Sequence, residues 1–94
     1  MPEHGYGTVI IVTYNSSGFI SRCLSSLEKG VIEGFYKVVV VDNCSTDQTV
    51  EIIKSDFTWV HLIKSEFNGG FGAGNNLGFS KMDGEWVLFL NPCL

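Results

Sequence analysis

The sequence is short of cysteine and of basic charge, and each shortage excludes a class of protein. Its three cysteines, Cys23, Cys44 and Cys93, are an odd number at wide spacing, which fits neither a disulfide framework nor a zinc cluster. Six Lys and Arg residues against ten Asp and Glu residues give a net charge of −4, whereas a nucleic-acid-binding protein normally carries a basic face. These counts predict a cytoplasmic protein without a nucleic-acid partner.

Long apolar runs are missing as well. The longest aliphatic runs cover residues 9–12 and 38–41, and a membrane span needs roughly 18 apolar residues. The N-terminus shows no basic region followed by an apolar stretch, so no signal peptide is predicted. We therefore expect a chain without a membrane span.

Apolar content in general is nevertheless high. Apolar residues make up 45% of the 94 residues and the mean hydropathy is +0.20, which excludes a disordered chain. This length allows one domain with a single modest core.

Four apolar runs, at residues 8–13, 37–42, 59–63 and 86–90, predict four strands. The first two are continuous runs rich in Val and Ile, typical of strands that are covered on both faces in a parallel sheet. Segments with helical features lie between the strands, at about 16–29, from 45 onward and at about 71–82. This alternation predicts an α/β fold with right-handed crossovers.

Serine and glycine residues mark where the predicted helices begin and end. Ser16 or Ser17 can cap the first helix, and Gly30 can end it. Ser45 and Gln48 stand three residues apart, as in a capping box, and predict that the second helix begins at Ser45.

Small, polar or acidic residues gather at the predicted carboxyl ends of the strands, while the strand bodies are apolar. In open parallel sheets, ligands bind beyond these ends. The end segments are residues 13–15, 42–47, 68–72 and 91–93. Their clustering is the main functional signal that the residues give by themselves.

Two aspartates in these segments have different expected roles. Asp42 follows four valines, and a partly desolvated carboxylate there can accept the N–H of a pyrimidine base or a ribose hydroxyl. Alternatively, Asp42 caps the next turn through its own backbone; we favour the ligand role because Ser45 can already cap the helix. Asp47 falls in a predicted first helical turn, where a negative charge suits the helix dipole, so we expect a structural role.

The glycine-rich stretch 68–78 follows the third predicted strand. Glycines in this position can let a backbone approach a phosphate. The stretch does not match the dinucleotide fingerprint G-x-G-x-x-G, because Asn75 and Leu77 stand where the last glycine is needed, and it lacks the lysine of a phosphate loop. A flexible loop is an equally good interpretation.

The histidines and cysteines form no catalytic pattern. We expect His4, near the N-terminus, and His61, inside a predicted strand, to be structural or solvated. Without a paired serine or cysteine nucleophile, no hydrolase triad is predicted. Cys23 falls on a predicted helix face in the core, and Cys44 is expected to be a solvent-facing thiol that nothing activates.

Taken in order and spacing, the strand ends resemble the N-terminal half of the family 2 inverting glycosyltransferases with the GT-A fold. The rhamnosyltransferase-like branch is the most similar, because of the Gly-Phe-Gly and Leu-Asn-Pro stretches. The resemblance covers about residues 8–93 and rests on Val-Thr-Tyr-Asn at 12–15, Val-Asp-Asn-Cys-Ser-Thr-Asp at 41–47, Asn-Gly-Gly-Phe-Gly at 68–72 with Asn76 and Gly78, and Phe-Leu-Asn-Pro at 89–92.

The resemblance implies a three-layer α/β/α fold with a mostly parallel four-stranded sheet in the order 3-2-1-4, and a UDP- or dTDP-sugar donor. In the family's layout, Thr13, Tyr14 and Asn15 line the nucleoside pocket and Asp42 reads the base. The pocket beside the nucleoside and sugar is lined by Asn68, Gly72 and Asn76, and Asn91 opens the short metal-binding motif. No catalytic residue is assigned to this chain.

The sequence departs from the family pattern in two places. The family has a metal-binding aspartate after Asn-Pro, whereas Cys93 stands here, and a thiol is a poor ligand for Mg²⁺ or Mn²⁺. The chain also stops at Leu94, before the family's acceptor-binding half and catalytic base. We therefore expect residues 1–94 to be a truncated donor-binding subdomain that binds the nucleotide-diphospho-sugar without transferring the sugar. Family members build cell-envelope polysaccharides at the cytoplasmic face of a membrane.

Two other interpretations remain open. One is a non-catalytic, self-associating α/β module, in which Trp86, Phe89 and Leu90 or the sheet edge would form a homodimer. The other is a dinucleotide-binding domain, which requires glycines directly after the first strand, where only Gly18 is found.

Overall fold

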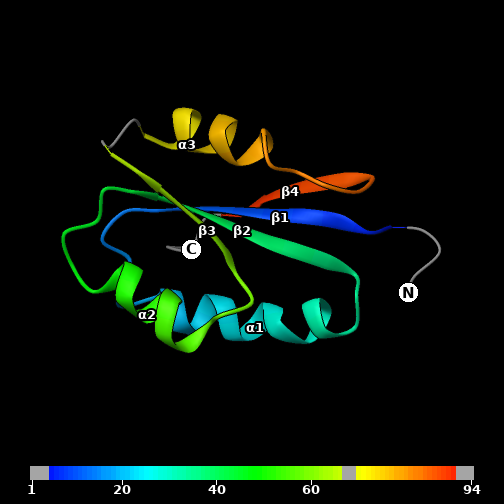
Figure 1. The fold of residues 1–94 in the computed structure, drawn as a ribbon, viewed down its shortest axis with the longest axis horizontal. Coiled ribbons are helices and arrows are strands. Elements are labelled where there is room, and N and C mark those ends of the chain that lie inside the picture. The colour runs from blue at the N-terminus through cyan, green and yellow to red at the C-terminus, as the bar shows by residue number, and fades with distance from the viewer. Residues whose placement is uncertain (1–4, 67–69, 91–94) are drawn as a thin grey trace.

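The computed structural model describes residues 5–66 and 70–90, which form a parallel sheet between two helical layers. Its strands are β1 (Gly7–Thr13), β2 (Tyr36–Asn43), β3 (His61–Ser65) and β4 (Trp86–Leu90), in the order β3-β2-β1-β4. The helices α1 (Ile20–Ile32) and α2 (Thr49–Asp56) cover one face, and α3 (Gly70–Phe79) covers the other (Figure 1). The three-layer fold and the strand order that the resemblance implies are both confirmed.

The two central strands hold the core because their side chains are buried on both faces. Successive strand residues point to opposite faces, so each valine run supplies both layers. One set, Val9, Ile11, Val38 and Val40, packs with Ile20, Leu24, Ile53 and Phe57 of the α1–α2 layer. The other set, Ile10, Val12, Val39 and Val41, lies under α3. Continuous apolar runs are therefore what this architecture requires.

Helix α3 approaches the sheet at its glycines. A Cβ atom on Gly74 would lie 2.7 Å from a side-chain carbon of Val12, and one on Gly78 would lie 2.5 Å from Ile10. Both glycines are buried, four residues apart and on one face of the helix. The glycine-rich stretch is thus largely helical, and part of its glycine content permits close helix–sheet packing.

Helix α1 begins later and ends later than predicted. The Ser16 carbonyl accepts the N–H groups of Phe19 and Ile20, and no side chain caps the helix. Gly30 does not end the helix but lies inside it, where a Cβ would come within 2.3 Å of the Tyr36 ring. The chain leaves the helix at Gly34, whose φ of 81° suits glycine.

The other element boundaries also differ from the prediction. Helix α2 begins at Thr49 instead of Ser45, because the Ser45 side chain is bonded to Asp42 and does not cap a helix. Strand β3 begins at His61, two residues late, since the Val60 N–H bonds the Phe57 carbonyl in a turn. Helix α3 covers 70–79 where 71–82 was expected.

Strand β4 forms one edge of the sheet and keeps apolar surface. Leu88 and Phe89 are both 47% exposed. Leu90 is half-buried, and half-buried Trp86 packs edge-on against Tyr36 and donates its indole N–H to the Gly5 carbonyl. Of the three residues expected on an uncovered face, Phe89 is the exposed one. No helix within 5–66 and 70–90 has the length and apolarity to cross a bilayer.

Candidate functional site

The loops that follow β1 and β2 meet at the carboxyl ends of the two central strands. These loops span residues 14–19 and 44–48. Thr13 and Asp42 are paired in the parallel register, so the two loops leave the sheet from the same level. Both loops lie at the end of the sheet from which α1 and α2 start (Figure 1).

Asp42 is 2% exposed and receives three hydrogen bonds. The Thr13 hydroxyl donates to Oδ1 at 2.7 Å, and the Ser45 hydroxyl donates to the same oxygen at 2.6 Å. The Ser45 N–H donates to Oδ2 at 2.9 Å. Asp42 therefore does cap the following turn, as the alternative interpretation held. The described residues leave one further acceptor position on Oδ2, because a carboxylate oxygen accepts two hydrogen bonds.

Asn15 ties the two loops together. Its side-chain Oδ1 accepts the N–H of Thr46 at 2.8 Å and the N–H of Asp47 at 3.3 Å. The backbone N–H of Asn15 donates to the Ser45 hydroxyl at 2.9 Å. Asn15 adopts a left-handed φ of 49°, which asparagine tolerates better than most residues. Its carboxamide oxygen thus accepts bonds from the protein, whereas no bond of its amide NH₂ group is found within 5–66 and 70–90.

Asp47 has the structural role that was expected, although it lies before α2 instead of in its first turn. It accepts the N–H of Ser17 at 3.1 Å and both the N–H and the hydroxyl of Thr49, at 3.0 and 2.5 Å. Burial by itself raises the pKa of Asp47, but the bonds from Thr49 and Ser17 outweigh it and lower that pKa from 3.8 to about 2. This carboxylate holds Ser17, in the loop after β1, against Thr49 at the start of α2.

Sequence reasoning missed two residues of this network. Ser45 was assigned to a helix cap, yet its hydroxyl accepts from Asn15 and donates to Asp42. Thr49 was not singled out, yet its hydroxyl accepts the N–H of Ser16 at 2.9 Å. Hydroxyl residues shortly after a buried aspartate were the available signal, because a carboxylate that is withdrawn from water needs donors.

Three of the remaining predicted site residues lie within the described part of the chain. Tyr14 is 49% exposed beside the network. Gly72 and Asn76 are exposed on α3, and no hydrogen bond among the described residues links them to Asp42 or Asn15. Two further predicted positions, Asn68 and Asn91, lie outside the described residues.

Within 5–66 and 70–90, no three His, Cys, Asp or Glu side chains are placed to hold a metal ion. Cys93, which stands at the family's metal-binding position, is outside that part of the chain. Cys44 is exposed, as expected, and Cys23 is partly buried against the core.

The sequence model of glycosyl transferase family 2 matches residues 8–92, which include both loops of the site. The chain belongs to glycosyl transferase family 2. The family match confirms the resemblance at this level. It does not test the rhamnosyltransferase-like branch, which stays a prediction.

Curated relatives include two bacterial transferases. The poly(ribitol-phosphate) beta-N-acetylglucosaminyltransferase TarS of Staphylococcus aureus is 39% identical over 88 residues, which are 89% of this chain and 15% of TarS. The SPbeta prophage-derived glycosyltransferase SunS of Bacillus subtilis is 33% identical over 81 residues, which are 86% of this chain and 18% of SunS. The chain thus spans less than a fifth of the length of either relative.

Solved glycosyltransferase structures share the fold. A crystal structure of S. aureus TarS 1-349 in complex with UDP has a TM-score of 0.80 and 38% identity, covering 93% of this chain and 27% of that one. The mannosyltransferase PcManGT from Pyrobaculum calidifontis, in complex with GDP-Man and Mn²⁺, has a TM-score of 0.81 over 94% of this chain and 27% of its own. Its 24% identity supports the fold alone. The sheet and helices are those of GT-A glycosyltransferases.

Proposed function

We propose that the rim at the carboxyl ends of β1 and β2 binds the nucleoside diphosphate of a sugar donor, UDP- or dTDP-linked. The observation that carries the proposal is buried Asp42, on which the described residues leave one acceptor position of Oδ2. The imide N–H of uracil or thymine, or a ribose hydroxyl, is a suitable donor to this position. TarS, which binds UDP in its crystal structure, supports a uracil nucleotide.

The residues around Asp42 have complementary proposed roles. Exposed Tyr14 offers a ring on which the base stacks. Asn15 keeps the loop in place and offers its amide NH₂ group to the ligand. Gly72 and Asn76 are proposed to line the sugar side, together with Asn68 and Asn91. Thr13 acts by orienting the Asp42 carboxylate.

For the whole protein we propose inverting glycosyl transfer. The oxygen of an acceptor hydroxyl attacks the anomeric carbon and forms the glycosidic bond. The bond from that carbon to the diphosphate oxygen breaks, its electron pair leaves with the nucleoside diphosphate, and the hydroxyl proton passes to a general base. We assign no base to this chain, which spans 15% of TarS, and propose that it binds the donor without transferring sugar.

A divalent metal is typical of this family and would neutralise charge on the leaving diphosphate. The described residues contain no group of side chains placed to hold one. No step is therefore assigned to a metal here.

We propose a hydroxyl of a cell-envelope polysaccharide as the acceptor, at the cytoplasmic side of the membrane. TarS and the poly(ribitol-phosphate) beta-glucosyltransferase of Bacillus spizizenii, which is 34% identical over 89 residues, support this class of acceptor. Neither name identifies the sugar that this chain binds.

Calorimetric titration of two matched aromatic variants tests the donor site. Tyr14 and Phe35 are 49% and 45% exposed, but Tyr14 follows β1 at the rim, whereas Phe35 precedes β2 at the opposite end of the sheet. We expect Tyr14→Ala to weaken UDP binding about tenfold, through lost base stacking. Phe35→Ala is the control and should leave the UDP affinity unchanged. Equal UDP affinity in wild type and Tyr14→Ala would contradict base stacking at the rim.

A further inference from the structure

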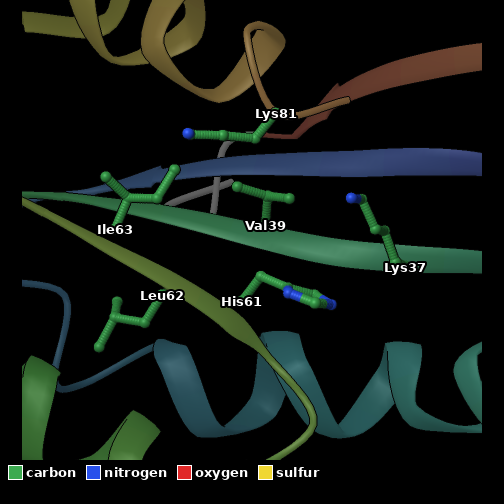
Figure 2. A pocket seen from close by; sticks show the side chains of 6 residues that line it. All are labelled: Lys37, Val39, His61, Leu62, Ile63 and Lys81. Atoms are coloured by element: carbon green, nitrogen blue, oxygen red, sulfur yellow. The ribbon is translucent and has the colours of Figure 1, made fainter. Parts of the chain in front are cut away.

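A cavity lies away from the rim, between β2, β3 and the segment that follows α3 (Figure 2). Its volume is about 390 Å³, within the usual range of small-molecule sites. Six residues line it: Lys37, Val39, His61, Leu62, Ile63 and Lys81. Lys37 is the second residue of β2, and Asp42 lies five residues further along that strand. The cavity is therefore distinct from the rim.

The charge of the lining is unlike the charge of the whole molecule. The chain has ten acidic residues against six Lys and Arg, yet the lining contains two lysines, a histidine and no carboxylate. Among the described residues, no ion pair joins Lys37 or Lys81 to an acidic side chain. Two positive charges without partners on one cavity favour an anionic ligand.

The sheet explains why these groups line one cavity. Lys37 shares a face of β2 with Val39, and His61 pairs with Val39 in the parallel register. Val39 belongs to the buried cluster on the α3 side, and Ile63 packs against that cluster. Figure 2 shows Lys81 reaching over this face from the α3 side, with the Lys37 amino group on the same side of β2. The cavity thus has positively charged side chains around an apolar floor, whose accessible part is half-buried Ile63 because Val39 is fully buried.

We propose that this cavity binds a small organic phosphate. The ammonium groups of Lys37 and Lys81 hold the phosphate oxygens, as lysines do in many phosphate sites. The carbon skeleton of the ligand covers half-buried Ile63, which bare phosphate leaves in contact with water. His61 supplies a further hydrogen-bond donor at the β3 edge.

The test is an NMR titration of the ¹⁵N-labelled chain with glycerol 3-phosphate and with inorganic phosphate, at constant ionic strength adjusted with chloride. We expect saturable shifts of the amides of Val39, His61 and Lys81. Glycerol 3-phosphate should bind more tightly than inorganic phosphate if the apolar floor contributes. Equal affinity assigns the site to phosphate alone and overturns the organic-ligand proposal, as do shifts that chloride reproduces.

Charge-removing variants provide the matched comparison. Lys37→Gln and Lys81→Gln should each weaken glycerol 3-phosphate binding about fivefold, the size expected for one partly solvated charge contact. Lys54→Gln is the control. Lys54 is exposed on α2 and does not line the cavity, so this variant should leave the affinity for glycerol 3-phosphate unchanged. An equal loss in all three variants indicates nonspecific attraction and contradicts the site.

The proposal of a nucleotide site and the proposal of a phosphate-binding cavity can be disproved independently of each other. Tyr14→Ala should leave glycerol 3-phosphate binding unchanged, because Tyr14 does not line the cavity. A protein that binds UDP but shows no saturable shift with glycerol 3-phosphate would disprove the cavity proposal alone.

Discussion

Ser45 is one of the residues that connect the two loops of the rim. Its hydroxyl accepts the N–H of Asn15 while donating to Asp42, so one side chain fixes both the position of the loop and the orientation of the carboxylate. Such a shared hydroxyl cannot be recognised from spacing alone, because Ser45 and Asn15 are 30 residues apart. The local pattern instead favoured a helix cap, which tertiary contacts override.

Replacing Ser45 by alanine should destabilise the fold. The variant leaves the Asn15 N–H and one Asp42 oxygen each short of a partner, and we expect a loss of about 1–2 kcal/mol of unfolding free energy. Urea unfolding followed by circular dichroism measures this loss. Ser26→Ala is the control, because the Ser26 hydroxyl donates to the Cys23 carbonyl on an exposed helix surface and its loss should change stability by less than about 0.5 kcal/mol. Equal effects of the two variants would argue against the bridging role of Ser45.

Asp47 gives stability a specific pH dependence. Its pKa of about 2 lies below the ordinary value of 3.8, so the ionised form is favoured by folding. The contribution is fully present above the ordinary pKa and is lost as pH falls from about 4 towards 2. We expect wild type to lose more stability than Asp47→Asn across this window in urea unfolding at each pH. Parallel pH profiles for the two proteins would contradict the role of Asp47.

At the scale of the elements, the glycines of α3 were the hardest part of the sequence to interpret. Glycine lowers helix propensity, so a flexible loop was an equally good prediction. The helix forms because Gly74 and Gly78 let it pack close to Val12 and Ile10, and burial compensates for poor propensity. The buried valine runs, by contrast, predicted β1 and β2 to within one residue at each end, because continuous apolar residues have few other uses in a short chain.

Alanine substitution separates packing from propensity in this helix. Gly74→Ala and Gly78→Ala should each destabilise the fold by about 1–3 kcal/mol, because the new methyl group overlaps the sheet. Gly72→Ala is the matched control: its Cβ meets nothing within 4 Å, so improved propensity should stabilise the fold by up to about 1 kcal/mol. Thermal unfolding measures all three variants. Stabilisation by Gly74→Ala would show that α3 does not pack on the sheet in this way.

At the scale of the whole molecule, the sheet separates two regions of different chemistry. The carboxyl ends of β1 and β2 carry Asp42 and its hydrogen-bonding partners, whereas Lys37, near the start of β2, belongs to the cationic cavity. The parallel topology that puts the loops at one end follows from the alternation of strands and helices. The position of the rim at the carboxyl ends of the strands could therefore be predicted from the sequence. The cavity was not predicted, because its lysines are far apart in the chain and only the fold brings them together.

The edge strand β4 leaves one sequence prediction open. Exposed Leu88 and Phe89 are compatible with the predicted self-association, which remains a prediction.

An amide-shift titration with UDP tests the central claim most directly. We predict saturable shifts at Tyr14, Asn15 and Asp42 at millimolar UDP, with no change at Gly34 and Phe35 on the opposite end of the sheet. The same titration with dTDP compares the two proposed bases. Unmoved amides at Tyr14, Asn15 and Asp42 at millimolar nucleotide would contradict a donor site at this rim.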